Sequence, residues 1–341
     1  MRAAELIAPL TFRLAEMPIE DPGPGEVQVR VEAVGVCGSD LHSYTEGAVG
    51  STPNVYPMVL GHEPAGVIVK AGAGVPGLAA GDRGALEPAL YCYHCEFCLT
   101  GRHNVCANIR FLSNPHHPGF FREMVNLPAA NFRPIPVDIS SDVATLAEPL
   151  AIALHSLRLT SIRAGESVAV IGAGPIGLLT IAALRAAGAG RIWAIEPLAH
   201  RRELARTMGA GAALEPDEAV EEILNATGQR GVDCAIDCAA GPETTNQAVM
   251  LTRNAGRVAL TGIHSTPLVS LDGSAMRRKE LTLYNVRRSN HETDEALELL
   301  QAQASWFAPI LTHARPIDRI DEAFAIASQY RDGVGKMIVR S

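Results

Sequence analysis

The feature that most constrains the fold is a glycine-rich turn between an apolar stretch and a helical one. Residues 167–172 (SVAVIG) have the apolar character of a buried strand, and residues 175–188 (PIGLLTIAALRAAG) have that of a helix. Gly172, Gly174 and Gly177 at their junction follow the spacing G-x-G-x-x-G. In such a turn the first glycine permits a tight bend, the second lets the backbone approach a pyrophosphate, and the third lets helix and strand pack closely. The pattern favours a dinucleotide-binding βαβ unit, although glycines also serve ordinary turns.

Strands and helices alternate after this turn. Residues 191–197, 232–239 and 257–263 are predicted strands, and residues 200–210 and 242–256 are predicted helices. Strands that alternate with helices imply parallel βαβ units with right-handed crossovers. This part of the chain is therefore predicted to be an α/β domain.

An acidic residue supports the dinucleotide interpretation. Glu196 lies at the end of the next predicted strand. A carboxylate at this place can accept hydrogen bonds from the adenosine ribose hydroxyls and would repel a 2′-phosphate, which favours NAD over NADP. The alternative is that Glu196 is a solvated residue that opens a helix. Arg201 and Arg202 are nearby cations that could tolerate some phosphate.

The beginning and the end of the chain have a different pattern. Residues 25–36 (GEVQVRVEAVGV) alternate polar and apolar positions as a half-buried strand does, and further short strands are predicted from Ala65 and Gly81. The first 140 residues therefore resemble an irregular β-rich domain. From about residue 286 the alternation of strands and helices fades, and a final helix and strand are predicted within 321–341.

Four of the seven cysteines lie close together, with the spacing C-x2-C-x2-C-x7-C. They are Cys92, Cys95, Cys98 and Cys106. Thiolates at such intervals can surround one tetrahedral zinc, and four protein ligands leave no open position for water or substrate. The stretch therefore predicts a structural zinc site. A disulfide pair is the alternative, but an odd cysteine count and a beginning without signal-peptide character favour a reducing, cytoplasmic location.

Composition excludes several classes of protein. A chain of 341 residues with 47% hydrophobic and 19% charged residues is globular and long enough for about two domains. A net charge of −8 and 5% aromatic residues argue against nucleic acid or an anionic membrane as partner. The uncharged run 168–184 approaches membrane-spanning length, but its glycines and proline interrupt a helix.

A second group of residues could hold a catalytic zinc. Cys37 ends a predicted strand, His62 and Glu63 follow in LGHEPAG, and Glu148 lies in LAEPLA. A catalytic zinc needs about three protein ligands and one exchangeable position. Taken separately these residues are ordinary, because a single cysteine is usually a small hydrophobe and a single histidine usually has no metal.

The chain resembles the medium-chain alcohol dehydrogenase superfamily. The motifs that carry the resemblance are VCGSDLHSY, GHEPAGVIVKAGAGV, GDRGALEP, the cysteine stretch, AEPLAIALHS and VIGAGPIGLL, in that order. Within the superfamily the chain is most similar to sorbitol and related polyol dehydrogenases, at ALEP, AEPLA and NVRRSN. The resemblance implies a GroES-like catalytic domain over residues 1–149, a Rossmann NAD-binding domain over 150–285 and a C-terminal return to the catalytic domain over 286–341.

The resemblance also implies roles for individual residues. Cys37, His62 and Glu63 would hold the catalytic zinc, and Glu148 would bind it directly or through its water. Ser39 would contact the substrate and relay its proton to His42, while Glu148 and Arg287 would also bind substrate. The expected cofactor-binding residues are Gly172, Gly174, Pro175, Ile176, Gly177, Glu196, Arg201, Thr261 and Val286. The match is poor over residues 112–124, where a pocket for the substrate would be built.

The predicted function is that of a zinc-dependent, NAD-linked dehydrogenase, with two zinc ions per chain. It would oxidise a secondary alcohol of a polyol or sugar derivative to a ketone, as a homodimer or homotetramer. Zinc makes the alkoxide accessible near neutral pH, and NAD supplies the redox chemistry. The alternatives are an L-threonine 3-dehydrogenase-like enzyme, a simple secondary-alcohol dehydrogenase, a zinc-free quinone reductase relative and a zinc-ribbon binding module.

Overall fold

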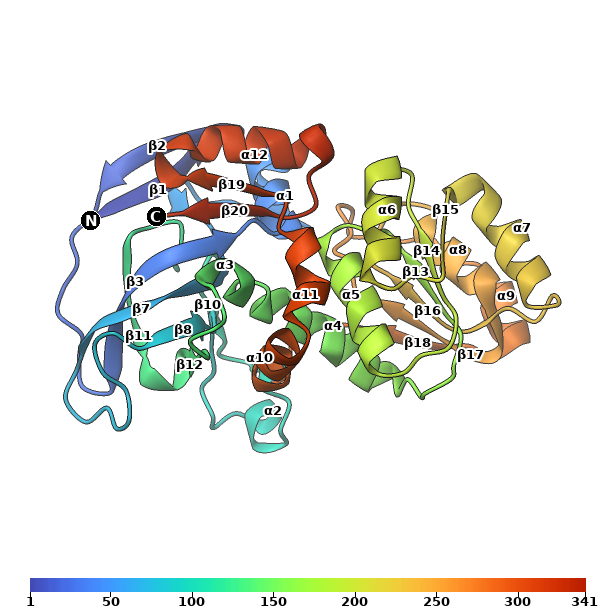
Figure 1. Ribbon diagram of the computed structural model, residues 1–341, viewed down its shortest axis with the longest axis horizontal. Coiled ribbons are helices and arrows are strands. Elements are labelled where there is room, and N and C mark those ends of the chain that lie inside the picture. Colours follow the sequence, from blue (N-terminus) through green and yellow to red (C-terminus); the bar gives the residue numbers. More distant parts are fainter. The chain divides into compact units, whose positions relative to one another are not determined.

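The computed structural model describes residues 1–341, which divide into two compact units. The first unit comprises Met1–Glu148, Thr293–Ala304 and Leu311–Ser341, and the second comprises Pro149–Glu292 and Ser305–Ile310 (Figure 1). Each unit has its own hydrophobic core. The end of the chain therefore returns to the unit in which the chain begins.

The first unit is built on a largely antiparallel sheet of seven strands. Its order is β12-β8-β7-β3-β20-β19, and β11 also pairs with β3. In that order the strands are Phe132–Pro134, Arg83–Leu86, Glu63–Ala71, Glu26–Gly35, Met337–Arg340, His313–Pro316 and, for β11, Met124–Pro128. Strand β20 lies antiparallel to β3, with Ile338 opposite Gly35, so the last residues of the chain complete this sheet.

Smaller elements surround this sheet. A three-stranded sheet contains β2 (Thr11–Glu16), β1 (Arg2–Ala8) and β6 (Met58–Val59). One two-stranded sheet contains β4 (Ala48–Val49) and β5 (Thr52–Pro53), and another contains β9 (Ala89–Leu90) and β10 (Arg110–Phe111). The helices are α1 (Gly38–Glu46), α2 (Glu96–Leu99), α3 (Ser141–Ala144), α10 (Thr293–Ala302) and α12 (Ile320–Ser328). Short 3₁₀ turns occupy His103–Val105, Ala129–Asn131, Ile317–Arg319 and Arg331–Gly333.

An aromatic cluster fixes helix α1 in the first unit. The ring of Phe324 in α12 lies 4.7 Å from that of Phe12, 5.1 Å from that of Tyr44 and 5.6 Å from that of Phe121, measured between centroids. Edge-on and tilted aromatic pairs at such distances are favourable beyond the area they bury. Tyr44 belongs to α1, so this packing holds the helix that carries Ser39 and His42.

The second unit contains a parallel six-stranded sheet in the order β15-β14-β13-β16-β17-β18. The strands are Ala212–Leu214, Ile192–Ile195, Val168–Ile171, Val232–Asp237, Thr252–Leu260 and Thr282–Asn285. The helices are α4 (Ala147–Thr160), which begins in the first unit, α5 (Pro175–Ala186), α6 (Ala199–Met208), α7 (Pro216–Ala226), α8 (Thr244–Leu251), α9 (Gly273–Lys279) and α11 (Ala304–Phe307), followed by a 3₁₀ turn at Ala308–Ile310. Numbered along the chain, the strand order is 3-2-1-4-5-6, the order of dinucleotide-binding folds. Ligands of such folds bind beyond the carboxyl ends of the strands, where the strand order reverses.

The apolar run 168–184 is divided between strand β13 and helix α5. All four residues of β13 are buried, as expected for the central strand of a parallel sheet that is covered on both faces. No helix of the chain has both the length and the apolar character needed to cross a membrane.

The second unit differs from the sequence prediction at several places. The helix predicted over 242–256 ends at Leu251, and Thr252 already belongs to β17, where it pairs with Val232. The Nε group of Arg253 donates to Asp233 at 2.7 Å, so tertiary contacts in the sheet override local helical preference. Strand β15 and helix α7 had no counterpart in the predicted elements, although Pro216 at the start of α7 is a recognised helix-start signal.

Candidate functional site

Strand pairing brings the first group of possible metal ligands together. Cys37 follows β3 and immediately precedes α1, and Glu63 is the first residue of β7. Strands β3 and β7 are antiparallel neighbours with Gly35 opposite Glu63. As a result one ligand atom from each of Cys37, His62 and Glu63 lies within 4.8 Å of the others.

The donors in this group suit a zinc ion. A thiolate, an imidazole and a carboxylate are the ligand types from which catalytic zinc sites are built. His62 is 6% exposed and Glu63 is 1% exposed, and the Glu63 Oε1 has no hydrogen-bond partner, whereas its Oε2 is paired with Lys336. Buried polar atoms without partners are costly, and a bound cation would satisfy them. The residues present therefore fit the metal.

Asp40 orients this group and was not singled out by the sequence. One of its carboxylate oxygens accepts from the Cys37 backbone N–H at 3.0 Å, and the other accepts from the Gly61 N–H at 3.2 Å and lies 3.4 Å from His62 Nδ1. A histidine that binds a metal commonly has a carboxylate beside its second ring nitrogen, and Asp40 stands at that place for His62. The available signal was position, since Asp40 follows Cys37 by one helical turn.

Charges around His62 favour a cation. Burial lowers the pKa of His62, but the Asp40 carboxylate and the Cys37 thiolate raise it further, so the pKa lies well above the usual value. Burial raises the pKa of Asp40. His62 and the hydrogen bonds from the backbone N–H groups of Cys37 and Gly61 lower it by more, so the pKa of Asp40 lies below the usual value. Negative groups that favour a proton on this ring also attract a metal ion.

Lys336 is a second residue that the sequence did not reveal. Its amino group forms an ion pair with Glu63 and donates to the Val36 carbonyl at 3.0 Å, and its side chain is 1% exposed. Lys336 directly precedes β20, so the end of the chain supplies the counter-charge to Glu63. Glu148, by contrast, lies at the start of α4 and is outside the group formed by Cys37, His62 and Glu63.

Helix α1 carries the two residues expected to move a proton. Ser39 Oγ lies 3.4 Å from His62 Nε2, next to the candidate metal group. His42 is further along the same helix, and its Nδ1 lies 2.7 Å from Glu46 Oε1. The side chain of His42 is 27% exposed, so α1 extends from the buried group to solvent.

The four clustered cysteines form a second group in the first unit. One sulfur from each lies within 4.8 Å of the other three. The Cys92 sulfur is 4.0 Å from that of Cys98 and 3.4 Å from that of Cys106, and the Cys95 sulfur is 3.9 Å from that of Cys106. Four sulfurs about 2.3 Å from a tetrahedral zinc would be about 3.8 Å apart. The cluster therefore has the dimensions of a closed zinc site, and all seven cysteines are free of disulfides.

Two thiols of this cluster titrate differently. The His94 backbone N–H and the Asn108 amide lower the pKa of Cys92 to about 5, so this sulfur is a thiolate near neutral pH. Burial raises the pKa of Cys98 to about 12. Since zinc binds thiolates, loading the cluster must release a proton from Cys98, and metal affinity should fall as the pH is lowered.

The glycine turn of the second unit has the geometry of a phosphate-binding loop. Gly172 has a φ of +87°, and a Cβ on Gly177 would lie 1.9 Å from the Gly172 carbonyl oxygen, so neither position accepts a side chain. Gly174 has open space around it. A Cβ at this position would have one neighbour within 4 Å, a terminal nitrogen of Arg201 at 3.8 Å. Gly174 is also the N-cap of α5 and has no side-chain cap, which leaves backbone N–H groups for an anion.

Glu196 is 4% exposed and fastens the glycine turn to strand β14. Its Oε2 accepts from the Ala173 N–H at 2.8 Å, and its Oε1 accepts from the Leu198 N–H at 3.0 Å. A carboxylate has about four acceptor sites, so two bonds to backbone leave capacity for ribose hydroxyls. The structure therefore assigns Glu196 a scaffolding role that the sequence did not predict.

The remaining expected cofactor residues lie on the second unit. Pro175 and Ile176 begin α5. The Thr261 N–H donates to the Asp237 carbonyl at 2.9 Å, and the Val286 N–H donates to the Leu260 carbonyl at 2.9 Å, which places both at the carboxyl ends of strands. The substrate candidate Arg287 is exposed and follows Val286, so it belongs to a different unit from Ser39.

Asp237 is a further residue that the sequence did not reveal. Its carboxylate accepts from the backbone N–H groups of Ala239 and Ala240, each at 3.0 Å, and from the hydroxyls of Thr244 at 2.8 Å and Thr245 at 2.9 Å. Four bonds fix the turn after β16, against which the glycine turn packs. Asp237 is therefore a structural support of the candidate dinucleotide site.

Comparison with known proteins identifies the family. Over residues 23–137 the chain matches the profile described as Alcohol dehydrogenase GroES-like domain, and over residues 175–302 the profile described as Zinc-binding dehydrogenase. It is 33% identical over 343 residues to a sorbitol dehydrogenase of Bacillus subtilis (strain 168), covering 99% of this chain and 97% of the relative. It is 34% identical over 325 residues to an L-threonine 3-dehydrogenase of Pyrococcus horikoshii, covering 94% and 93%.

Solved structures agree with this result. An alcohol dehydrogenase of Escherichia coli CFT073 in complex with NADH has a TM-score of 0.90 at 28% identity, over 100% of this chain and 99% of that chain. A zinc-binding dehydrogenase of Sinorhizobium meliloti 1021 bound to NADP has a TM-score of 0.90 at 30% identity, with the same coverage. Fold and sequence thus define the class as zinc-binding dehydrogenases with a GroES-like and a Rossmann domain. The chain belongs to the medium-chain alcohol dehydrogenase superfamily, near its polyol dehydrogenases.

Proposed function

We propose that this protein is an NAD-linked, zinc-dependent dehydrogenase that oxidises a secondary alcohol of a polyol or sugar derivative to a ketone. The observation that carries the proposal is the buried group of Cys37, His62 and Glu63, whose ligand atoms lie within 4.8 Å of one another. The first unit would supply the catalytic zinc site, and the second would bind NAD through its glycine turn. Residues 1–149 and 286–341 would then act together as the catalytic domain, with 150–285 as the cofactor domain.

Two zinc ions are part of the proposal. Cys37, His62 and Glu63 would hold the catalytic ion, and Glu148 would bind it directly or through its water. The four clustered cysteines would hold the structural ion. When bound, the catalytic zinc acts as a Lewis acid on the alcohol oxygen, and NAD accepts the hydride.

The chain's own residues would move the proton. Ser39 Oγ, 3.4 Å from His62 Nε2, stands beside the metal group and can accept the proton of the substrate hydroxyl. His42 can receive it next, because Glu46 engages its Nδ1 and leaves Nε2 for exchange. Imidazole is a common proton carrier in proteins because its two ring nitrogens can accept and release a proton in turn.

The cofactor is proposed to be NAD. The Glu196 carboxylate keeps acceptor capacity for the ribose hydroxyls, and its negative charge disfavours a 2′-phosphate. A terminal nitrogen of Arg201 lies 3.8 Å from the position of a Cβ on Gly174, beside the turn that would hold the pyrophosphate. The relative bound to NADP shows that the fold can take either cofactor, so the assignment depends on these residues and not on the family.

A polyol is proposed as substrate on chemical grounds. Carboxylates beside the zinc can accept hydrogen bonds from hydroxyls next to the reacting carbon, and Arg287 can donate to others. A site built to pair hydroxyls discriminates strongly against analogues that lack them. The relatives described as L-threonine 3-dehydrogenases make threonine the second candidate. Threonine would require paired groups for an ammonium and a carboxylate.

Zinc analysis together with an NADH-binding titration tests the proposal. About two zinc ions per chain and saturable NADH binding are expected. A metal-free protein that binds NADPH would instead indicate a quinone reductase relative, and a protein that binds zinc but no dinucleotide would indicate a binding module. Assembly into a homodimer or homotetramer is also proposed, because β18 is an edge strand.

A further inference from the structure

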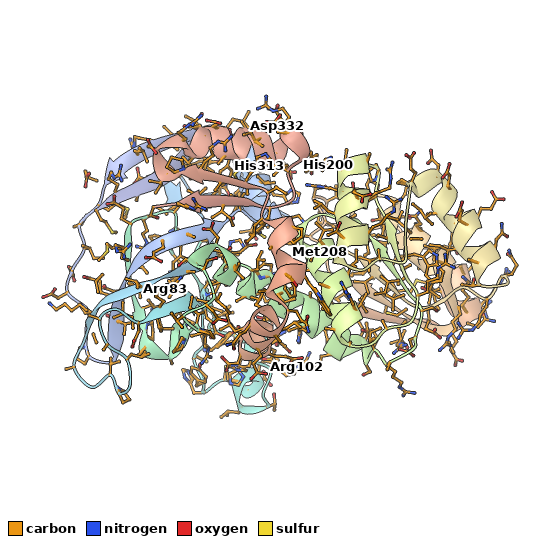
Figure 2. The ribbon with its side chains drawn as sticks, viewed as in Figure 1. Arg83, Arg102, His200, Met208, His313 and Asp332 are labelled. Atoms are coloured by element: carbon orange, nitrogen blue, oxygen red, sulfur yellow. The ribbon has the colours of Figure 1, made fainter.

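We propose that Glu215 is a cofactor-specificity residue, which holds Arg202 in an ion pair and thereby keeps its guanidinium from receiving the 2′-phosphate of NADP. This inference rests on the proposed dinucleotide site. Without this ion pair, the positive charge of Arg202 would favour NADP. Arg202 lies on helix α6, whose two ends are marked by His200 and Met208 in Figure 2.

Glu196 and Glu215 are neighbours at the same edge of the parallel sheet. Strand β14 pairs with β15, with Ile195 opposite Leu214, and the Glu196 N–H donates to the Leu214 carbonyl at 3.0 Å. Each glutamate directly follows its strand, so both stand at the carboxyl edge, where dinucleotides bind in this fold. The acidic residue after the second strand marks the ribose end of that site. Glu215 extends the acidic character of this end away from the glycine turn.

Arg202 is held by three hydrogen bonds that engage both terminal nitrogens. One nitrogen donates to the carbonyls of Glu196 at 2.9 Å and Pro197 at 2.7 Å. The other donates to Glu215 Oε1 at 2.6 Å. The side chain of Arg202 is 14% exposed and that of Glu215 is 58% exposed. The guanidinium is thus fixed against the backbone that follows β14, at Glu196 and Pro197.

The bond to Glu215 is the one that decides where the guanidinium points. Charge-assisted bonds to a carboxylate are about twice as strong as bonds to neutral acceptors. The carbonyls of Glu196 and Pro197 alone would therefore hold the Arg202 guanidinium less firmly than they do together with Glu215. Without Glu215 the arginine keeps its charge and loses its counter-charge. A 2′-phosphate is then the strongest acceptor within reach, because arginine forks match phosphate geometry. Glu215 would therefore act by occupying the Arg202 guanidinium.

The alternative role for the pair is structural, as a link between α6 and the end of β15. Surface ion pairs of this exposure contribute little to stability, about 0–1 kcal/mol. A purely structural pair would change thermal stability slightly and would leave the choice between NADH and NADPH unaltered. Binding of the two reduced cofactors therefore separates the two roles.

The experiment compares Kd for NADPH and NADH by fluorescence titration, together with kcat/KM for NADP and NAD. Glu215→Gln and Glu215→Ala should each strengthen NADPH binding relative to NADH by about tenfold, as one recovered charge-assisted contact would. The double change Glu215→Gln with Arg202→Met should cancel this gain, since the phosphate acceptor site is then gone. The matched control is Glu203→Gln on α6, which removes the same charge from the partner of Arg206 and should leave the ratio unaltered.

Several results would overturn the inference. An unchanged Kd ratio in both Glu215 variants would do so, as would a gain that persists without Arg202. An equal gain in Glu203→Gln would show a general charge effect. If the unaltered protein binds neither NADH nor NADPH, the proposed function itself fails, which is a separate outcome from an unchanged ratio.

Discussion

Lys336 and Glu63 form an ion pair in the interior of the first unit, with each side chain 1% exposed. The pair joins a residue beside the last strand to a candidate metal ligand on β7. Removing one partner of a buried pair leaves an uncompensated charge, which costs about 3–5 kcal/mol. The end of the chain therefore sets the charge balance at the proposed zinc site.

Replacing Lys336 by methionine should destabilise the metal-free protein by about 3 kcal/mol, because the Glu63 carboxylate loses its counter-charge. Zinc would restore part of this loss, since the cation takes over as partner of Glu63. The increase in Tm on adding zinc to chelated protein should thus be larger in Lys336→Met than in the unaltered chain. Lys279→Met is the matched control, because Lys279 donates to the ends of α8 in the other unit. An equal zinc-induced increase in Tm in the unaltered chain, Lys336→Met and Lys279→Met would contradict this prediction.

Replacing Cys95 by serine should remove the structural zinc and leave the catalytic one. Zinc content is expected to fall from two ions per chain to one, and Tm should decrease because structural zinc contributes folding energy. The rate of the chemical step should change much less than the stability. Metal analysis and calorimetry on the same preparation check both effects. Full zinc content with unchanged melting would refute the assignment of this cluster.

Replacing Cys37 by alanine should abolish turnover and leave NADH binding intact. The metal group and the glycine turn belong to different units, so a change in one should not disturb the other. The measurement is NADH titration alongside kcat. Cys234→Ala serves as control, because Cys234 is buried in the other unit and outside both metal groups. Substantial turnover by a verified Cys37→Ala protein would show that this residue is no ligand.

Asp233 should make the second unit sensitive to acid. Burial raises the pKa of Asp233, but Arg230, Arg253 and Ser167 lower it further, so it lies well below the usual value. A carboxylate whose pKa is depressed on folding stabilises above its unfolded pKa, near 3.9, and loses this contribution as the pH falls toward the folded pKa. Asp233→Asn should cost about 2 kcal/mol at pH 7 and a smaller amount at pH 3, where the unfolded carboxyl is largely protonated, and the remaining cost should disappear only as the pH falls through the folded pKa.

Denaturant unfolding at both pH values measures this effect. Glu221→Gln provides the control, because Glu221 is an exposed carboxylate in the same unit and should change stability little at either pH. A cost for Asp233→Asn that is the same at pH 3 and pH 7 would show that its charge contributes nothing.

Local patterns predicted the fold well because the relevant signals are short. The glycine turn is determined by contacts between residues that are close in the sequence, since Gly172 and Gly177 approach each other within a span of six residues. The predicted fold class, a GroES-like domain with a Rossmann domain, is confirmed by both family matches. The helix predicted over 242–256 was too long, because pairing of Thr252 with Val232 depends on a strand that lies elsewhere in the sequence.

The supporting residues of the candidate site could not be predicted from the sequence. Lys336 meets Glu63 only when the last strand joins the first sheet, and no local spacing encodes that contact. Glu215 meets Arg202 through an ion pair between the end of β15 and helix α6, which depends on how helix and sheet pack. Asp40 was closer to prediction, since it follows Cys37 by a helical turn, but its bond to the Gly61 N–H needs the folded loop.

The most direct test of the central claim is NADH formation from a panel of alcohols, assayed before chelation, after chelation and after zinc is restored. The panel comprises sorbitol, galactitol, xylitol, threonine and 2-butanol. The account predicts the highest kcat/KM for one of the polyols, loss of that activity on chelation and its recovery with zinc. A wide preference for threonine or 2-butanol would contradict the polyol assignment, and undiminished activity in verified zinc-free protein would contradict the zinc-dependent mechanism itself.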